Sequence, residues 1–146
     1  MEYLRAGVGV IIANEEKKIL ICKRKAKLGF GTYSIPGGNI ELGEKIISAA
    51  VREVFEETGL EVKNLVFLGI TNNIDIYKIG HSHSISIIFY TNEYIGTVEL
   101  KEPNKHESWS WYLPSEIPEP HFEPSKLATN LLNKYLLNEN KKFIEE

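Results

Sequence analysis

Residues 44–58 contain neither glycine nor proline, and Gly59 follows them directly. Glycine is common just past the last turn of a helix, so this segment predicts a helix that ends at Thr58. At about 100° per residue, four apolar side chains share one face of this helix: Ile47, Val51, Val54 and Phe55. We expect this face to pack against the core, which requires an apolar layer elsewhere in the chain.

Segments with the pattern of strands lie on both sides of this helix. Residues 7–13 are an apolar run typical of a buried strand, and residues 18–22 form its hairpin partner after a turn at residues 14–16. Three further strands are predicted at residues 62–71, 82–90 and 107–111. An amphipathic helix is predicted at residues 124–137. The order strands, helix, strands, helix predicts an α/β or α+β sandwich, with a mixed sheet between helices.

Length and charge exclude several classes of protein. The 146 residues suit one domain, expected over residues 1–138, with residues 139–146 as a polar tail that frays. Twenty acidic and seventeen basic side chains give a net charge of −3, which lacks the basic footprint of a nucleic-acid-binding protein. The single cysteine excludes an intramolecular disulfide, and the N-terminus does not have the pattern of a signal peptide. Apolar runs are too short to cross a bilayer, so we expect a cytoplasmic protein without a nucleic-acid or membrane partner.

Three glutamates lie together on the other side of the predicted helix. Glu53, Glu56 and Glu57 stand at i, i+3 and i+4, and Arg52 can pair at i+4 with only one of them, Glu56. Like charges at this spacing destabilise a helix, and a divalent cation bound over them would relieve the repulsion. Ligands that are all oxygen favour Mg²⁺ or Mn²⁺ over Zn²⁺. The alternative is a solvated acidic face, since glutamate is a good helix former.

The predicted helix is part of a longer pattern. Gly38 is followed by five residues and Glu44, then by seven residues and the run R-E-V-F-E-E-T-G-L at residues 52–60. Every specified position of the Nudix box is present in this spacing, and the chain resembles the Nudix hydrolases. Four further segments extend the resemblance to the small MutT-type diphosphatases, namely residues 8–10, 23–25, 36–38 and 107–111.

In that family the box is a loop–helix–loop that holds divalent metal ions against a diphosphate while water attacks phosphorus. The resemblance implies that Glu53 and Glu57 are the main ligands of Mg²⁺, for which Mn²⁺ substitutes. It also implies that Glu56 and the carbonyl of Gly37 add to the ligand set. Clustered carboxylates with such a cation can neutralise developing charge and activate water, which is what phosphoryl chemistry needs.

Further catalytic roles follow from the resemblance. Arg52 is implied to orient a box carboxylate, and Glu44, at the helix start, to act through water or to hold the loop. The general base is left open. Glu53 and Glu57 are candidates, and Glu107, just ahead of a strand, is a candidate outside the box. The alternative for Glu107 is an exposed loop charge.

Substrate contacts are predicted around the loop that precedes the box. Arg24, in a run of three basic residues, is expected to bind a terminal phosphate, because guanidinium binds phosphate through two hydrogen bonds. Lys25, Gly38 and Asn39 complete the predicted substrate-binding residues, although the lysine also suits the solvated end of a hairpin. Gly37 and Gly38 are expected to permit a positive φ and close approach of the backbone to metal or phosphate.

The base-binding part of the site is less specified. In members of the subgroup that hydrolyse thiopurine nucleotides, a Phe-Trp pair at the start of the last helix helps to enclose the base. Here Phe122 is followed by Glu123, and Asn39 stands where those relatives have histidine. Base selectivity therefore stays open. The candidate base contacts are Phe30, Tyr33, Asn39 and Phe122.

Three functions are compatible with these observations. The first is a nucleoside triphosphate pyrophosphatase that releases a monophosphate and pyrophosphate. The second is a pyrophosphatase for ADP-ribose or a nucleotide sugar. The third, a non-catalytic nucleotide-binding module, predicts a degraded box, whereas this box is intact. The resemblance implies a nucleotide substrate and leaves a homodimer open.

Overall fold

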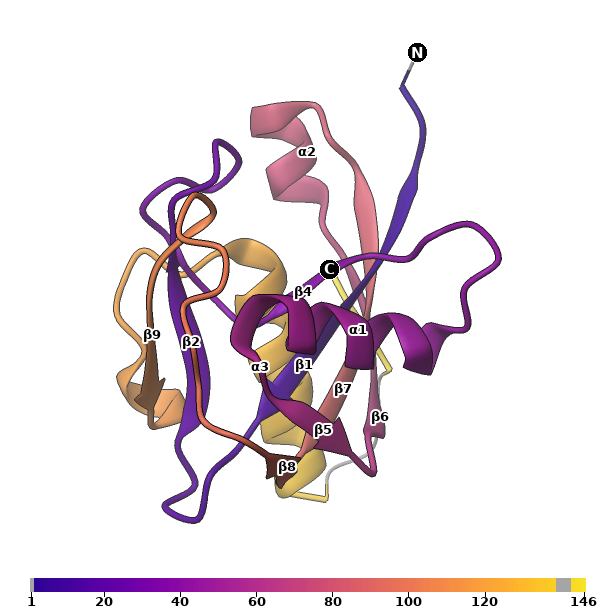
Figure 1. The fold of residues 1–146 in the computed structure, drawn as a ribbon. Helices are drawn as coiled ribbons and strands as arrows, with labels where there is room; N and C mark the ends of the chain where they lie inside the picture. Colours follow the sequence, from indigo (N-terminus) through magenta and orange to yellow (C-terminus); the bar gives the residue numbers. More distant parts are fainter. Residues whose placement is uncertain (1, 139–142) are drawn as a thin grey trace.

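The computed structural model describes residues 2–138 and 143–146, and its main layer is a five-stranded mixed sheet (Figure 1). Its strands are β1 (Arg5–Ile12), β4 (Gly37–Asn39), β6 (Val66–Asn72), β7 (Ser84–Thr91) and β10 (Ile144–Glu145), in the order β10-β6-β7-β1-β4. β1 runs parallel to β7, whereas β4 is antiparallel to β1 and β6 is antiparallel to β7. The predicted mixed sheet is confirmed.

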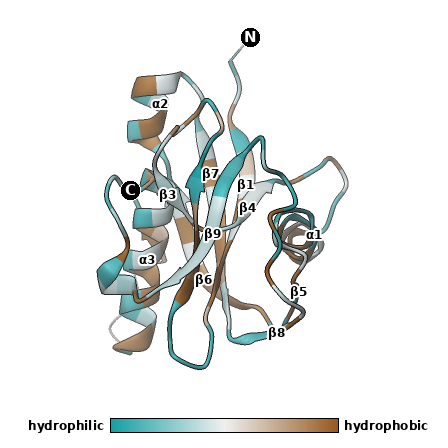
Figure 2. Ribbon diagram, turned by 60° about the vertical axis from the view of Figure 1, so that its left-hand side comes forward, coloured by the Kyte–Doolittle hydropathy of each residue, from teal (hydrophilic) through white to brown (hydrophobic). Residues whose placement is uncertain are grey.

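Two smaller sheets and the helices complete the domain. β2 (Ile19–Arg24) pairs antiparallel with both β3 (Tyr33–Ser34) and β9 (His106–Tyr112), and β5 (Glu61–Lys63) pairs with β8 (Glu93–Ile95). Figure 2 shows α1 (Ile46–Thr58) on one face of the main sheet and α3 (Glu123–Leu136) on the other. The remaining helices are α2 (Ile74–Gly80) and a short 3₁₀ helix (Pro114–Glu116). Helices on both faces confirm the predicted sandwich.

The strand β1 carries apolar side chains to both faces of the sheet. Val10 and Ile12 belong to the core on the α1 side, whereas Ile11 belongs to the core on the α3 side. Because both faces of β1 are covered, apolar residues are needed at successive positions and not only at alternate ones. This explains the uninterrupted apolar run that predicts the strand.

The helix α1 turns a different face to the core from the one that its apolar pattern predicts. Ile47 and Phe55, which we expected inside, are 50% and 45% exposed. The buried residues of the helix are Ala49, Ala50, Val54, Glu57 and Thr58. The alanines let the helix lie close to the sheet, and Glu57 turns inward because its carboxylate finds hydrogen-bond partners there. The prediction is confirmed for Val54, which is fully buried, and for Val51, which packs against the core. It was wrong for Ile47 and Phe55 because it considered apolar side chains alone.

Some boundaries also differ from the prediction. The helix begins at Ile46 instead of residue 44, and it ends at Thr58 as predicted, with Gly59 in the left-handed region (φ 77°). The segment predicted as a strand over residues 62–71 divides into β5 and β6, and α2 was not predicted. The short strand β3 and the strand β4, which precedes the box helix, were not predicted either.

The C-terminal segment takes part in the fold. Residues 139–142 of the expected polar tail lie outside the described residues. Beyond them, Ile144 and Glu145 pair in parallel with β6, and the ring of Phe143 stacks on that of Phe67 with 6.3 Å between centroids. The end of the chain therefore adds an edge strand to the main sheet, so the expectation of a frayed tail is corrected for residues 143–146.

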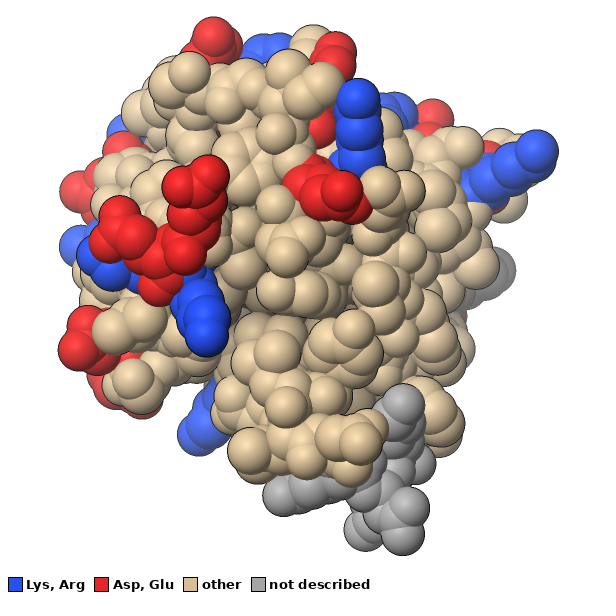
Figure 3. Space-filling model, turned by 90° about the horizontal axis from the view of Figure 1, so that it is seen from below, with Lys and Arg blue, Asp and Glu red and all other residues tan. Residues whose placement is uncertain are grey.

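The surface seen from below carries acidic and basic side chains in small mixed groups between wide uncharged areas (Figure 3). This face is not dominated by charge of one sign. Among the residues that the structure describes, no helix is both long and apolar enough to cross a membrane.

The orientation of α1 can be tested by two substitutions. Ala50→Leu adds volume at a fully buried position and should lower the free energy of unfolding by about 1–3 kcal/mol. Ile47→Ala, at a half-exposed position, should lower it by less than about 1 kcal/mol. Urea denaturation followed by circular dichroism measures both values. If Ile47→Ala were the more destabilising change, α1 would have the orientation that its apolar pattern predicts, and the structure would be contradicted.

Candidate active site

The side chain of Arg52 organises the acidic residues along α1. Its Nε and Nη2 donate to the two carboxylate oxygens of Glu44 over 2.7 and 2.9 Å. Its Nη1 donates to Glu53 over 2.9 Å and to Glu56 over 3.2 Å. The hydrogen bonds from Arg52 lower the pKa of the Glu44 carboxyl to about 2. One guanidinium thus holds three carboxylates, more than the i+4 spacing alone indicates.

Arg52 and Glu44 also fix the loop that precedes α1. Glu44 accepts a hydrogen bond from the backbone N–H of Glu41 over 3.0 Å, and Arg52 donates to the carbonyl of Asn39 over 3.1 Å. Glu44 therefore lies among the residues that hold the loop. These contacts join the loop, β4 and α1 through one side chain.

The carboxylate of Glu57 is buried, with only 6% of the residue exposed, and both of its oxygens have partners. Oε1 accepts the backbone N–H of Gly37 over 2.8 Å, and Oε2 lies 2.8 Å from Nε2 of His106. An unpartnered buried carboxylate would be costly, so these contacts fix the side chain. They also tie α1 to β4 and β9.

Gly37 and Gly38 allow β4 to lie directly against its neighbours. A Cβ on Gly38 would overlap the carboxylate of Glu53, and a Cβ on Gly37 would overlap the carbonyl oxygen of Val8. Neither glycine has a φ in the left-handed region. The expected positive φ is therefore wrong, and close approach alone explains why a side chain is not tolerated at these positions.

The surroundings of Glu53 disfavour its negative charge. Burial raises the pKa of its carboxyl to about 7, the hydrogen bond from Arg52 opposes this rise, and the charges of Glu57 and Glu56 add to it. Crowded carboxylates with incomplete charge compensation fit a divalent cation, which takes oxygen ligands. The residues that could hold it are Glu53 and Glu57, which line the same cavity as Gly37. Glu56 is half exposed and does not line that cavity.

Glu107 does not join these carboxylates. It is exposed and pairs with Lys23 over 3.4 Å, outside the cavity that the box carboxylates line. A β-bulge accounts for this, because Lys23 pairs with Ser108 and Arg24 pairs with His106, which leaves Glu107 as the extra residue. The prediction for Glu107 is therefore corrected.

Two residues that the sequence analysis missed lie beside Glu57 instead. Glu102 and His106 each offer one ligand atom, and these atoms and one of Glu57 all lie within 4.8 Å of one another. Glu102 also pairs with Lys105 over 3.3 Å. Alternation along β9 would have placed His106 incorrectly, since the bulge at Glu107 shifts the alternation at that point. Glu102 lies outside the strand, so alternation gives no signal for it.

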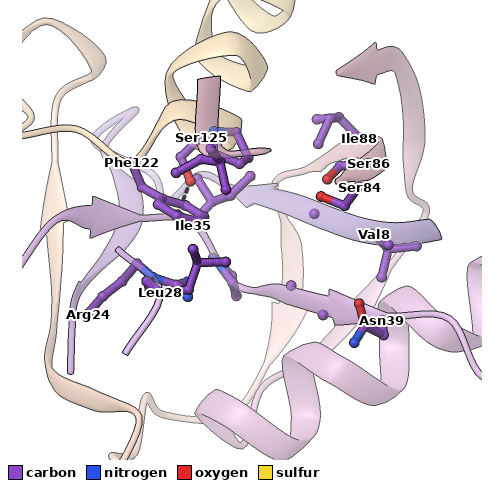
Figure 4. Close-up of a pocket in the computed structure, with 17 residues that line it drawn as sticks. Val8, Arg24, Leu28, Ile35, Asn39, Ser84, Ser86, Ile88, Phe122 and Ser125 are labelled. Carbon is purple, nitrogen blue, oxygen red and sulfur yellow. Dashed lines mark hydrogen bonds between the residues drawn. The ribbon is translucent and has the colours of Figure 1, made fainter. Parts of the chain in front are cut away.

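Two adjoining cavities meet at β4. The box cavity, of about 270 Å³, is lined by Glu53 and Glu57 among others. The sheet cavity, of about 210 Å³, lies over β1 and β7 and reaches the start of α3, with Ile88 and Phe122 among its walls (Figure 4). Four residues line both cavities: Arg24, Gly37, Gly38 and Asn39. One ligand can therefore place a charged part in the box cavity and a flatter, less polar part in the sheet cavity.

Arg24 lies at the junction of the two cavities. Its Nε donates to the carbonyl of Leu28 over 3.0 Å, and its guanidinium carbon lies 4.0 Å from the ring centre of Phe122. Burial lowers the pKa of the guanidinium, which nevertheless stays protonated at neutral pH. In the described part of the chain no carboxylate forms an ion pair with Arg24. Its remaining N–H groups can therefore donate to an anion.

The other predicted substrate contacts fall into two groups. Asn39 and Phe122 line the sheet cavity. Lys25 is exposed and lines neither cavity, and Phe30, 71% exposed, also lies outside both. Tyr33 packs against the core on the α3 side. The structure therefore brings Glu53, Glu57, Gly37, Arg24 and Asn39 to one cavity. Glu56 does not line that cavity, and Lys25 lies on the surface.

Comparisons with known proteins agree with this geometry. Residues 3–131 match the family model described as the NUDIX domain. The chain is 34% identical over 131 residues to the ADP-ribose pyrophosphatase of Methanocaldococcus jannaschii, which covers 89% of this chain and 75% of that protein. The MutT NUDIX hydrolase of Burkholderia pseudomallei has a similar structure, with a TM-score of 0.84, 26% identity and coverage of 90% of this chain and 99% of that one.

A shorter similarity involves an RNA pyrophosphohydrolase of a Psychrobacter species. The identity is 36% over 75 residues, which is 51% of this chain and 42% of that protein. This chain thus spans three quarters of the archaeal relative and about two fifths of the Psychrobacter one.

The raised pKa of Glu53 predicts how cation binding depends on pH. In the metal-free protein Glu53 keeps its proton up to about pH 7, whereas in the unfolded chain it loses it near pH 4.5, so stability falls as pH rises between these values. A cation binds the deprotonated form, so its affinity should rise with pH up to about pH 7. Millimolar Mg²⁺ should therefore raise the Tm more at about pH 8 than at about pH 6.

Glu53→Gln is the control, because it removes the titrating group and should remove the pH dependence of the Mg²⁺-induced shift in Tm. EDTA provides the metal-free reference at each pH. An equal shift in the unmodified protein at both pH values would contradict the assignment, as would a pH dependence that persists in Glu53→Gln.

Proposed function

We propose that this chain cleaves a nucleoside triphosphate to a monophosphate and pyrophosphate. It belongs to the Nudix family of hydrolases, which act on phosphorus-containing anhydrides. The observation that carries the proposal is the junction at Arg24. An unpaired guanidinium there lies between a cavity lined by carboxylates and a cavity with apolar walls. A nucleotide has these same two parts, a polyphosphate and a flat base.

The residues of the box suit a Mg²⁺-dependent reaction, with Mn²⁺ as a substitute. Glu53, Glu57 and Glu56, with the carbonyl of Gly37, would hold the cation. When bound, it would neutralise charge on the phosphate oxygens and lower the pKa of a nearby water. Arg52 keeps Glu53 in place through the hydrogen bond of 2.9 Å.

The proposed reaction requires binding of phosphate and transfer of one proton. Arg24 donates to phosphate oxygens and holds the triphosphate across the junction of the cavities. A water oxygen attacks phosphorus, the bridging P–O bond breaks, and pyrophosphate leaves. The proton of the water passes to a carboxylate of the box cavity, for which Glu53, Glu57 and Glu102 are in place.

A second candidate function is hydrolysis of ADP-ribose. The observation that favours it is the 34% identity to the archaeal ADP-ribose pyrophosphatase over most of this chain. The charge at Arg24 favours the triphosphate instead. A nucleoside triphosphate carries a charge of about −4 near neutral pH and ADP-ribose about −2, and Coulomb attraction grows with the product of the charges.

The two functions differ in their substrate preference. We expect kcat/KM for dCTP or dGTP to exceed that for ADP-ribose by at least about tenfold at the same Mg²⁺ concentration. Arg24→Ala should lower kcat/KM for the triphosphates by at least about tenfold, and Arg24→Lys, which keeps the charge but not the two-pronged geometry, should give an intermediate value. Lys63→Ala, at an exposed position of β5, is the control for loss of a positive charge.

A tenfold preference for ADP-ribose would replace the first function by the second. Unchanged triphosphate hydrolysis in Arg24→Ala would show that the triphosphate does not lie across the junction. Initial rates from pyrophosphate and AMP release over a range of substrate concentrations give the required constants.

A further inference from the structure

Two serines form a polar end wall in the sheet cavity. Ser84, Ser86 and Ile88 follow one another at alternate positions of β7, and all three line the cavity (Figure 4). On the neighbouring strand β1, Gly7 is paired with Ser86 and Gly9 with Ile88. A Cβ on Gly9 would lie only 3.0 Å from Ile88, so the absence of side chains on β1 keeps this part of the cavity open.

A buried amide holds both serine hydroxyls. Asn73 is fully buried, and its Nδ2 donates to Oγ of Ser84 over 2.9 Å and to Oγ of Ser86 over 3.1 Å. Each serine oxygen is therefore an acceptor toward Asn73, so its own O–H group points away from that amide. Neither O–H has an acceptor among the residues that the structure describes. The two serines thus offer two O–H donors to whatever occupies the cavity.

The other walls suit a flat ring. Ile35, Ile88 and Phe122 are apolar, and Arg24 covers part of the Phe122 ring. A flat ring that packs against these apolar side chains can turn one edge to the serines. The hydrogen-bonding character of that edge therefore decides whether the two O–H donors find acceptors or are left without them.

We infer that Ser84 and Ser86, held by Asn73, select a nucleobase whose edge carries a carbonyl oxygen over one whose edge carries an amino group. The inference rests on the proposed function in so far as it places a nucleoside in the sheet cavity. Guanine offers O6 and N7 as neighbouring acceptors, and thymine offers O4. Adenine presents an amino group next to N7, so one serine would have to accept from that amino group and turn its own O–H away, where the described residues provide no acceptor.

The structure assigns different roles to these three residues. Ser84 and Ser86 contact the base and determine specificity. Asn73 is a positioning residue, because it does not line the cavity and acts by keeping both hydroxyl oxygens occupied as acceptors. The same arrangement disfavours the adenine of ADP-ribose, so it bears on both candidate functions.

Binding of product-like monophosphates tests the inference without depending on turnover. Titration calorimetry with dGMP, dIMP and dAMP compares three purines of similar shape, of which dIMP has the carbonyl of dGMP but not its amino group. We expect dGMP and dIMP to bind about 5- to 150-fold more tightly than dAMP, the range of discrimination of a good pair of base contacts. In Ser84→Ala/Ser86→Ala this ratio should fall to about one.

Two variants serve as controls. Ser84→Thr/Ser86→Thr keeps both hydroxyls and should retain the preference, and Ser115→Ala, at an exposed position outside the cavity, should leave it unchanged. Circular dichroism and the Tm report whether each variant folds. If the double alanine variant does not fold, Ser86→Ala alone should reduce the ratio at least threefold.

Three results would overturn the inference: dAMP binding as tightly as dGMP, a preference that survives in the folded alanine variants, or no binding of any of the three monophosphates. Failure of the proposed function gives a different result. In that case the ratio of monophosphate affinities would be as expected, but no triphosphate would be hydrolysed.

Discussion

A carboxylate buried as deeply as that of Glu57 needs a hydrogen-bond partner for each oxygen, and the rest of the site depends on how these partners are provided. Gly37 provides one from β4 and His106 provides the other from β9. To reach them, α1 has to turn Glu57 toward the sheet. The alanines at positions 49 and 50 then enter the core, and Ile47 and Phe55 are left half exposed. The site therefore determines how the helix packs.

Arg52 extends this arrangement to the surface of the helix. It donates to Glu44, Glu53 and Glu56, but its hydrogen bond does not offset the effect of burial on Glu53, which together with the charge of Glu57 raises the pKa of that carboxyl to about 7. Carboxylates whose charges were fully compensated would bind a cation less tightly. The incomplete compensation is consistent with carboxylates that are held in place by Arg52 and still able to bind a divalent metal.

Most of the longer elements and the residues of the box could be predicted from the sequence, because both depend on local spacing. The helix α2 was missed, and the predicted hairpin of residues 7–13 with residues 18–22 was wrong, because β2 pairs with β3 and β9. The mixed sheet, the two covering helices and the end of α1 at Thr58 all follow from runs of apolar residues and from glycine. What local spacing could not predict are features that depend on distant segments. The rotation of α1 results from partners on β4 and β9, and the place of His106 results from a bulge at Glu107 that only strand pairing reveals. The sheet cavity combines glycines of β1, serines of β7 and Phe122, which are far apart in the chain.

The central claim is that α1 and β4 hold Glu53 and Glu57 so that together they bind one divalent cation at the junction with the nucleotide cavity. Anomalous diffraction from crystals soaked in Mn²⁺ tests it directly, because the position of the ion is located without reference to activity. The account predicts an anomalous peak at about 2.0–2.3 Å from carboxylate oxygens of both Glu53 and Glu57. A peak beside Glu107, or no peak at the box in well-ordered crystals, would contradict it.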